Sequence, residues 1–254
     1  MDVEALADRS GGWRIEHRVA TASTNDDAMH TALGPRTVVV ADAQAAGRGR
    51  AGRAFASPTG GLYASLVLSV PPEDVPAGVV ALVALAGAEA IDTCMPVTAA
   101  IKWPNDLWIG ERKVGGILLE RRGDGAVVAG IGINVVAAPA DLPDDVRPHV
   151  TALAAESDEA PTRDMLLLAL LGAVDRLQAL RAEPEGAAAV EAAWRARLAL
   201  LGASVTYTFA GATHEGVLED ISLHEGLLVR DPVSGPVWRT AAHVQDLRPA
   251  GRTI

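Results

Sequence analysis

Three arginines and three glycines lie within seven consecutive residues, 47–53 (Gly-Arg-Gly-Arg-Ala-Gly-Arg), in a chain that is otherwise acidic and rich in alanine. Glycine lets the backbone approach a ligand closely, and the arginine guanidinium presents forked donors that suit phosphate or carboxylate. The stretch therefore predicts an anion-binding loop. A solvated surface turn is the alternative, and an isolated Gly-Arg repeat would favour it.

Lysine and asparagine are scarce. Only two of the 22 basic residues are lysines, Lys102 and Lys113, and the three asparagines are Asn25, Asn105 and Asn134. This scarcity suggests a coding bias that replaces lysine by arginine wherever either serves. The five survivors are therefore candidates for positions where arginine or aspartate would fail chemically.

These residues fall at the ends of predicted strands. Residues 102–106 (Lys-Trp-Pro-Asn-Asp) form a predicted turn, Lys113 starts the next strand, and Asn134 ends a third. Lysines, arginines and amides would suit a substrate that has a carboxylate, together with a nucleotide triphosphate and Mg²⁺. The cations would neutralise charge at a transferring phosphorus, and Asn105 or Asp106 could contact the metal.

Hydrophobic periodicity predicts the elements that position these residues. Strands are expected over residues 13–20, 37–41, 62–70, 99–106, 107–109, 114–120 and 126–136. The last is nearly all apolar and should be central, and its Gly130 and Gly132 suggest close approach of a ligand or backbone. Helices are expected from Ser23 or Thr24 and over 76–93, 164–180 and 187–200, with a surface loop over 137–161.

The texture changes after Gly202, where short strand-like runs alternate with turns. The runs are residues 205–209, 216–221, 227–230 and 237–240. This spacing predicts a small all-β barrel and hence two domains, 1–201 and 202–254.

Composition excludes several classes. A net charge of −10 argues against bulk nucleic-acid binding and against an anionic membrane surface. The single Cys94 excludes an internal disulfide and a cysteine-based zinc site, and the six histidines have no metal-ligand spacing. Glycine, proline and an acid interrupt the apolar run 75–91, so a buried helix fits it better than a membrane span. With no visible N-terminal signal, we expect a cytoplasmic protein.

Taken together, the motifs closely resemble the biotin protein ligase family. The resemblance covers roughly residues 13–136, and the β-rich tail resembles that family's SH3-like C-terminal domain more vaguely. It is carried by residues 23–25 (Ser-Thr-Asn), Gln44, 47–53, 102–106, 112–118 (Arg-Lys-Val-Gly-Gly-Ile-Leu) and 130–134 (Gly-Ile-Gly-Ile-Asn).

The resemblance implies an α+β fold: a class II aminoacyl-tRNA synthetase-like catalytic domain with a mixed sheet and flanking helices, followed by the SH3-like domain. It implies an enzyme that makes biotinoyl-5′-AMP from biotin and ATP with Mg²⁺. The biotinoyl group would then pass to a lysine of a biotin carboxyl carrier domain of an acyl-CoA or pyruvate carboxylase. A monomer or homodimer without DNA or membrane partners is expected. A DNA partner is not expected because too few residues precede the first strand for the repressor domain of some relatives.

The resemblance also implies residue roles. The expected biotin-binding residues are Ser23, Thr24, Asn25, Gln44, Arg48, Gly49, Arg50, Lys113, Gly115 and Gly116. The expected ATP- or adenylate-binding residues are Arg48, Arg50, Arg53, Phe55, Lys102, Asn105 and Asn134, with Asn105 also the candidate magnesium contact. The expected catalytic residues are Lys113, Arg48, Arg50, Lys102 and Asp106, the last orienting the acceptor lysine. Members usually carry tryptophan at the position of Phe55, so a smaller aromatic face is expected against adenine.

Other interpretations remain open. Residues 47–52 satisfy G-x-G-x-x-G, but residues 53–61 will not open the helix that a dinucleotide site requires. A lipoate or octanoate ligase of the same superfamily is the nearest enzyme alternative, and pyrophosphate release with biotin or lipoate would separate the two. A ligand-binding regulator or nucleic-acid module is a third class, which a salt-dependent DNA-binding assay would test.

Overall fold

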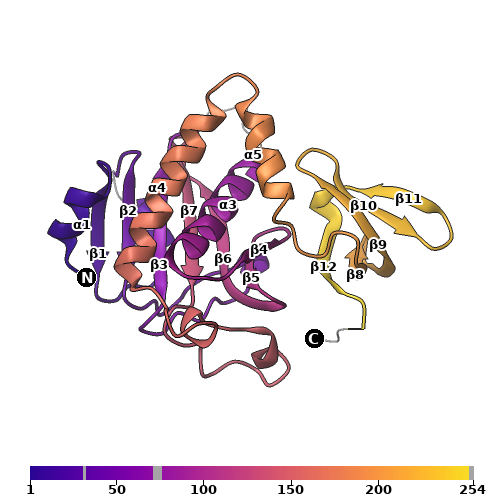
Figure 1. Cartoon of the computed structure of the whole chain (residues 1–254), viewed down its shortest axis with the longest axis horizontal. Helices are drawn as coiled ribbons and strands as arrows, with labels where there is room; N and C mark the ends of the chain where they lie inside the picture. Colours follow the sequence, from indigo (N-terminus) through magenta and orange to yellow (C-terminus); the bar gives the residue numbers. More distant parts are fainter. Residues whose placement is uncertain (31–32, 71–75, 252–254) are drawn as a thin grey trace.

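The computed structural model describes residues 1–30, 33–70 and 76–251, so the last three residues of the expected C-terminal domain lie outside the described part. A seven-stranded mixed sheet has the order β1-β2-β3-β7-β6-β5-β4 (Figure 1). Within this sheet β1 and β2 pair in parallel, and the other neighbouring strands pair antiparallel. The strands are β1 (Arg14–Arg18), β2 (Thr37–Ala41), β3 (Leu62–Leu68), β4 (Ala99–Lys102), β5 (Asp106–Ile109), β6 (Arg112–Arg121) and β7 (Val127–Ile133). As predicted, the nearly all-apolar strand is the central one.

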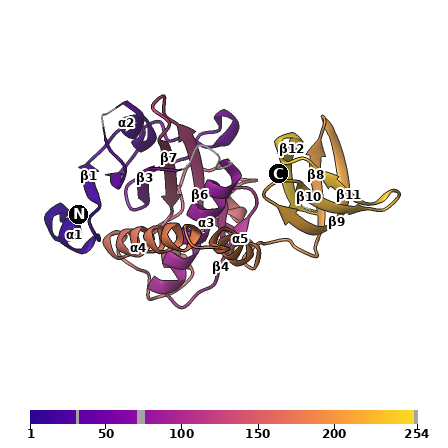
Figure 2. The same ribbon diagram turned by 90° about the horizontal axis from the view of Figure 1, so that it is seen from above.

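Helices cover both faces of this sheet. Figure 2 shows α3 (Pro76–Cys94), α4 (Arg163–Arg181) and α5 (Gly186–Arg195) on one side and α2 (Thr24–His30) on the other, while α1 (Val3–Arg9) lies beside the N-terminal edge. The predicted mixed α/β fold with flanking helices is confirmed.

Burial alternates along the strands between these two faces. Val38 and Val40 belong to the large core shared with α3 and α4, whereas Val39 joins Val67 and Val128 in a small core under α2. Because both faces are covered, all five residues of β2 are buried and the four that follow Thr37 are apolar. The α2 side has the smaller core, which leaves room on that face for polar residues.

Helix α3 is the core helix of the sheet. Its window Ala77–Cys94 is the one described stretch long and apolar enough to cross a membrane, and 67% of it is buried inside the protein. The helix packs between the sheet and α4. The prediction of a buried helix over residues 76–93 is therefore confirmed.

A second sheet begins at Ser204 and has the order β11-β10-β9-β8-β12. Its strands are β8 (Ser204–Phe209), β9 (Ala212–Ser222), β10 (Gly226–Asp231), β11 (Gly235–Arg239) and β12 (Val244–Pro249). Sequence reasoning missed β12 because only Val244 and Leu247 of that strand are buried. An all-β C-terminal unit is confirmed.

Two expectations about connecting segments were wrong. Helix α5 ends at Arg195, not at residue 200, because residues 197–199 pair with edge strand β4: Ile101 N donates to Arg197 O and Ala199 N donates to Ile101 O, each at 2.8 Å. This pairing covers the sheet edge. The stretch 137–161 is not only a surface loop, since it contains the 3₁₀ turns η2 (Arg147–His149) and η3 (Leu153–Ala155) and buries Leu153.

Candidate active site

A row of four residues crosses the α2 face of the sheet, and we call its two central glycines the glycine floor. The strand register places Tyr63, Gly132, Gly116 and Asp106 side by side on β3, β7, β6 and β5. The two central positions are glycines, so this row, which we call the trough, has no side chain of its own between Tyr63 on one side and Asp106 on the other. Burial raises the pKa of Tyr63 to about 12, and its hydroxyl donates to Pro58 O at 2.7 Å.

Two side chains lie directly on this floor. A β-carbon at Gly132 would come 2.4 Å from the Phe55 ring, and one at Gly116 would come 3.3 Å from Lys113 Nζ. Lys113 Nζ also lies 5.7 Å from the centre of the Phe55 ring. Glycine is therefore required at 132, where a ring lies too close for a β-carbon, whereas at 116 a β-carbon would need only a small shift of the Lys113 side chain. The sequence pattern had indicated such an approach without identifying Phe55 and Lys113.

One side of the trough is a neutral network, which we call the polar pocket: Thr24, Asn25, Gln44 and Ser65. Thr24 donates to Gln44 Oε1 from its backbone nitrogen at 2.8 Å and from its hydroxyl at 3.0 Å. Ser65 Oγ lies 2.8 Å from Thr24 Oγ1 and 2.5 Å from Asn25 Oδ1. Thr24, Asn25 and Ser65 are buried, and the network leaves their orientations fixed.

The polar pocket depends on another glycine. A β-carbon at Gly130 would lie 2.2 Å from Asn25 Oδ1, so only glycine lets this amide rest on β7. Ser23 precedes the helix, is also buried, and accepts from Asp27 N at 3.1 Å through its carbonyl. Helix α2 thus begins where expected, and its first residues face the strands.

The Gly-Arg loop is a folded hairpin. Phe55 N donates to Gly47 O at 2.8 Å, and Gly49 N donates to Arg53 O at 2.7 Å. The turn needs positive φ at Ala51 (55°) and Gly52 (74°). The hairpin carries Phe55 back over the sheet, which explains how the loop and the floor come together.

The three loop arginines have different surroundings. Arg48 donates to Asp26 and Glu120, and the hydrogen bond to Asp26 is the leading cause that raises its pKa. Arg50 stands at the exposed hairpin tip, where loss of hydration is the leading cause that lowers its pKa and the Asp106 carboxylate acts in the opposite direction. Arg53 lies 3.5 Å from Asp246 of β12. Two protein carboxylates therefore occupy the guanidinium of Arg48, whereas Asp106 influences Arg50 through its charge.

The opposite side of the trough is charged, and we call it the lysine cluster: Lys102, Asp106 and Lys113. Lys113 Nζ lies 2.7 Å from Asp106 Oδ1, and Lys102 Nζ lies 4.0 Å from Asp106 Oδ2. Burial lowers the pKa of Lys102, with Asp106 acting in the opposite direction and Lys113 reinforcing the decrease. Two cations share one carboxylate, so the cluster can accept a further anion.

Two asparagine amides are oriented by backbone carbonyls. Asn105 donates to Ile117 O at 2.7 Å, and buried Asn134 donates to Thr151 O at 3.0 Å. Thr151 N in turn donates to Lys113 O at 2.8 Å. Thr151 therefore supports two expected site residues, and sequence reasoning missed it because it lies in a stretch without periodicity.

The described residues contain no group of three histidine, cysteine, aspartate or glutamate side chains that could hold a metal ion. Asp106, the nearest carboxylate to Asn105 in sequence, already faces two lysines. The donor set does not form a protein cage for Mg²⁺. It is compatible with a metal ion that arrives on substrate phosphates and keeps its waters.

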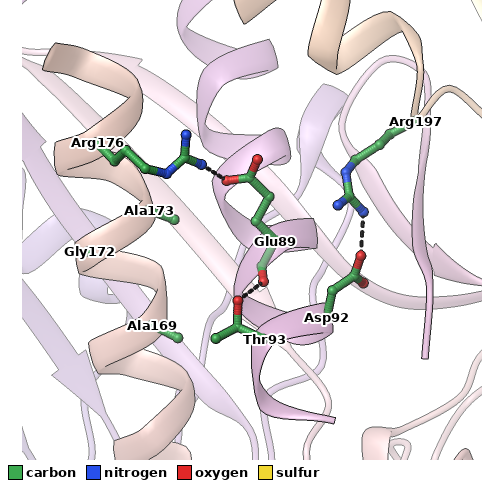
Figure 3. A pocket seen from close by; sticks show the side chains of 8 residues that line it. All are labelled: Glu89, Asp92, Thr93, Ala169, Gly172, Ala173, Arg176 and Arg197. Atoms are coloured by element: carbon green, nitrogen blue, oxygen red, sulfur yellow. Dashed lines mark hydrogen bonds and ion pairs between the residues drawn. The ribbon is translucent and has the colours of Figure 1, made fainter. Parts of the chain in front are cut away.

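A hollow of about 440 Å³ lies between α3 and α4 (Figure 3), which cover the side of the sheet opposite α2 (Figure 2). Arg176 pairs with Glu89, and Arg197 pairs with Asp92 at 2.6 Å, while small side chains of α4 form its wall. Since each cation there has its own carboxylate, we assign these pairs to joining α3 with α4 and with the segment after α5.

Comparison with known proteins agrees with the geometry. Residues 17–136 match the Biotin/lipoate A/B protein ligase family. The chain is 36% identical over 229 residues to the biotin–[acetyl-CoA-carboxylase] ligase of Paracoccus denitrificans, covering 85% of this chain and 94% of that protein. The chain belongs to the biotin protein ligase family.

Other members of this family extend the match. The biotin–[acetyl-CoA-carboxylase] ligase of Mycobacterium tuberculosis is 32% identical over 269 residues, covering 98% of this chain and 96% of that protein. The Aquifex aeolicus biotin protein ligase, solved in complex with biotin and ATP, has a TM-score of 0.82 at 24% identity. That alignment covers 93% of this chain and 99% of the other, and it identifies the fold.

Proposed function

We propose that this chain is an ATP-dependent biotin protein ligase. It activates biotin as biotinoyl-5′-AMP and transfers the biotinoyl group to a lysine of a biotin carboxyl carrier domain. The observation that carries the proposal is the apposition of the polar pocket and the lysine cluster across one glycine floor. Membership of the biotin protein ligase family supports the same reaction.

The polar pocket would bind the uncharged ring system of biotin. We assign this role to Ser23, Thr24, Asn25 and Gln44, because fixed amide and hydroxyl groups can match the donors and acceptors of a ureido ring. Glycines 49, 115 and 116 would let backbone approach the ligand. A β-carbon at Gly115 would lie 2.6 Å from Gly132 O, so this position already requires glycine.

The lysine cluster would handle the charged ends of both substrates. The biotin carboxylate attacks the α-phosphorus of ATP, a new C–O–P bond forms, and pyrophosphate leaves with the electrons of the broken P–O bond. Both reactants are anions, so Lys113 between them would lower their repulsion. We assign Lys102, Arg50 and Arg53 to the phosphates, and Phe55, Asn105 and Asn134 to the nucleotide side.

The transfer step has a different requirement, because its nucleophile is an amine and not an anion. The acceptor lysine must attack the acyl carbon as a neutral amine: the amide C–N bond forms, the acyl C–O bond breaks, AMP leaves with its electrons, and the amine loses a proton to water. We propose that Asp106 orients this amine, because its carboxylate already faces two lysine ammonium groups, at 2.7 Å and 4.0 Å. The contact of Lys102 with Asp106 Oδ2 is the longer one, so this oxygen could accept a hydrogen bond from the acceptor amine.

ATP would enter with Mg²⁺, for which Asn105 offers an amide oxygen. The acceptor would belong to an acyl-CoA or pyruvate carboxylase, and the enzyme would act in the cytoplasm as a monomer or homodimer without DNA or membrane partners. Residues 1–201 and 202–254 would form the catalytic and C-terminal domains.

The test uses the full chain with Mg-ATP, a purified biotin carboxyl carrier domain and either biotin or lipoate. We expect pyrophosphate release and a carrier mass gain of one biotinoyl group, with biotin only. Labelling with lipoate and none with biotin would reject the proposal in favour of a lipoate ligase. A carrier whose acceptor lysine is replaced by arginine is the matched control.

A further inference from the structure

Arg48 is held by two carboxylates from different elements. One terminal nitrogen lies 2.6 Å from both oxygens of Asp26 on α2, and the other lies 2.8 Å and 3.0 Å from the oxygens of Glu120 on β6. The three side chains are between 31% and 38% exposed. Both terminal nitrogens of this guanidinium are therefore occupied by the protein.

Glu120 also reaches the polar pocket. Asn25 Nδ2 donates to Glu120 Oε2 at 2.8 Å, the same oxygen that accepts from Arg48. One carboxylate thus connects the amide of the pocket to the base of the Gly-Arg hairpin. Asp26 follows Asn25 directly on α2, and Glu120 on β6 accepts from the Asn25 amide, so both anchors of Arg48 are linked to this amide.

The charges of this group disfavour a bound anion. One guanidinium faces two carboxylates, so the three groups together are negative. A substrate carboxylate or phosphate at Arg48 would have to displace one carboxylate and approach the other. By contrast, Lys102 and Lys113 share a single carboxylate and together remain positive.

We propose that Asp26 and Glu120 are positioning residues which, through Arg48 and Asn25, fix the Gly-Arg hairpin against α2 and β6 and so shape the biotin pocket. Arg48 then acts as a strut inside the protein and does not bind the substrate anion. This differs from the role expected for a loop arginine from the sequence, and it rests on the proposed biotin-ligase function.

The two roles of Arg48 predict opposite results for Asp26→Asn. If Arg48 is a strut, losing one charged anchor loosens the hairpin, and we expect biotin to bind about ten-fold more weakly. If Arg48 binds the substrate anion, Asp26→Asn frees the guanidinium, and biotin binds equally well or more tightly. Calorimetric titration with biotin alone measures this difference without catalysis.

Glu120→Gln tests the second anchor of Arg48, and the double variant Arg48→Gln with Asp26→Asn tests whether Asp26 acts through Arg48. We expect Glu120→Gln to weaken biotin binding at least as much as Asp26→Asn, since it also loosens Asn25. Arg48→Gln combined with Asp26→Asn should bind biotin no worse than Arg48→Gln alone, because both act through one contact. ATP affinity, measured separately, should stay within about two-fold, since the lysine cluster is untouched.

Asp27→Asn is the matched control, as it removes the same charge from the next residue of α2, whose carboxylate faces Arg18. It should leave biotin affinity unchanged. Hydrogen exchange of residues 47–55 should accelerate in Asp26→Asn but not in the control. Unchanged or tighter biotin binding in Asp26→Asn would overturn the inference, whereas a wild-type chain that binds no biotin would refute the proposed function itself.

Discussion

The two sides of the trough are built by different means. The polar pocket consists of neutral side chains, and its threonine, asparagine and serine are buried, hydrogen-bonded with one another and, through Asn25, with Glu120. The lysine cluster is charged, and its two cations share one carboxylate, the second at 4.0 Å. One side is complete without a ligand, while the other still has positive charge to neutralise.

This difference separates two tasks of a ligase. A neutral ligand part is recognised by groups that are already oriented, because little reorganisation is then needed on binding. A reaction between two anions needs cations whose charge is not yet compensated. The polar pocket should therefore govern which acid is bound, and the lysine cluster should govern how fast it is activated.

The largest effect should follow loss of Lys113, the residue that faces both the floor and Asp106. We expect Lys113→Ala to lower biotin-dependent pyrophosphate release about 10²- to 10³-fold, because a fixed cation at the developing charge is lost. Biotin affinity should fall much less, since the polar pocket is intact. Arg121→Ala, an exposed cation at the other end of β6, is the control. Equal losses of rate and affinity would break the division between the two sides.

Gly130→Ala tests the opposite side. Its methyl group would lie 2.2 Å from Asn25 Oδ1, so the amide must leave its position on β7. We expect biotin binding to weaken about ten-fold or more and the free energy of unfolding to fall by about 1–3 kcal/mol. ATP binding should change little. Isothermal titration with each substrate and urea unfolding measure the three quantities.

Gly172→Ala is the control for that substitution. Gly172 lies inside α4 and a β-carbon there meets nothing within 4 Å, so alanine should stabilise the helix by about 0.5–1 kcal/mol. Biotin binding in this variant should equal that of the unchanged chain. If Gly130→Ala left biotin affinity intact, Asn25 would have no part in recognition.

Much of the fold followed from local patterns. Continuous apolar runs marked β2, β3 and β7, because helices bury both faces of those strands. Strand β12 and the end of α5 were not predictable in this way. Alternate burial is broken in β12 by two outward residues, Gln245 and Asp246, and α5 stops where pairing with Ile101 begins. Both outcomes depend on partners that are remote in sequence.

The site was predictable where its residues were chemically unusual. Lys102, Lys113 and Asn25 stood out by their scarcity, and Gly130 and Gly132 by their place in an apolar strand. Ser65 gave a weaker signal, a hydroxyl within the buried run of β3, and it was missed. Whether Arg48 meets a ligand or a protein carboxylate depends on three-dimensional charge pairing, which no sequence spacing shows.

Lys102→Met would sharpen the comparison, because it removes the buried cation of the lysine cluster. Burial lowers the pKa of Lys102, so the folded chain binds fewer protons than the unfolded chain between that pKa and the usual value of 10.5. In this window the stability of the unchanged protein rises with pH, and below it the buried charge is a cost. We expect Lys102→Met to be more stable at pH 7 and to lack that rise.

The same variant should bind ATP about ten-fold more weakly, through loss of a charge-assisted contact. Urea unfolding between pH 7 and pH 10.5 and nucleotide titration are the measurements. Asp106 keeps Lys113 as its partner at 2.7 Å, so the substitution leaves no isolated carboxylate. A less stable variant would mean that the charge of Lys102 stabilises the folded protein. The lysine cluster would then have no uncompensated positive charge for a ligand to neutralise.

The smallest effect should come from Asp246, a residue of the C-terminal sheet whose charge acts on Arg53 and Lys102. Its backbone φ is 50°, and the pairing of β12 with β8 is shifted between Gln245 and Arg248, which turns the carboxylate toward Arg53 at 3.5 Å. Its charge also raises the pKa of Lys102 against the effect of burial. Asp246 is therefore a negative charge close to the proposed phosphate site.

We expect Asp246→Asn to bind ATP more tightly at low salt, because a negative charge near the phosphates is removed. The gain should be only about two- to five-fold, because exposed charges interact weakly. The gain should vanish near 1 M salt, where screening shortens the reach of the charge to about 3 Å. Glu225→Gln removes an exposed charge from the turn between β9 and β10 and should have no effect. Weaker ATP binding in Asp246→Asn would instead make the carboxylate a support for Arg53, and the C-terminal sheet would then help to build the charged side of the trough.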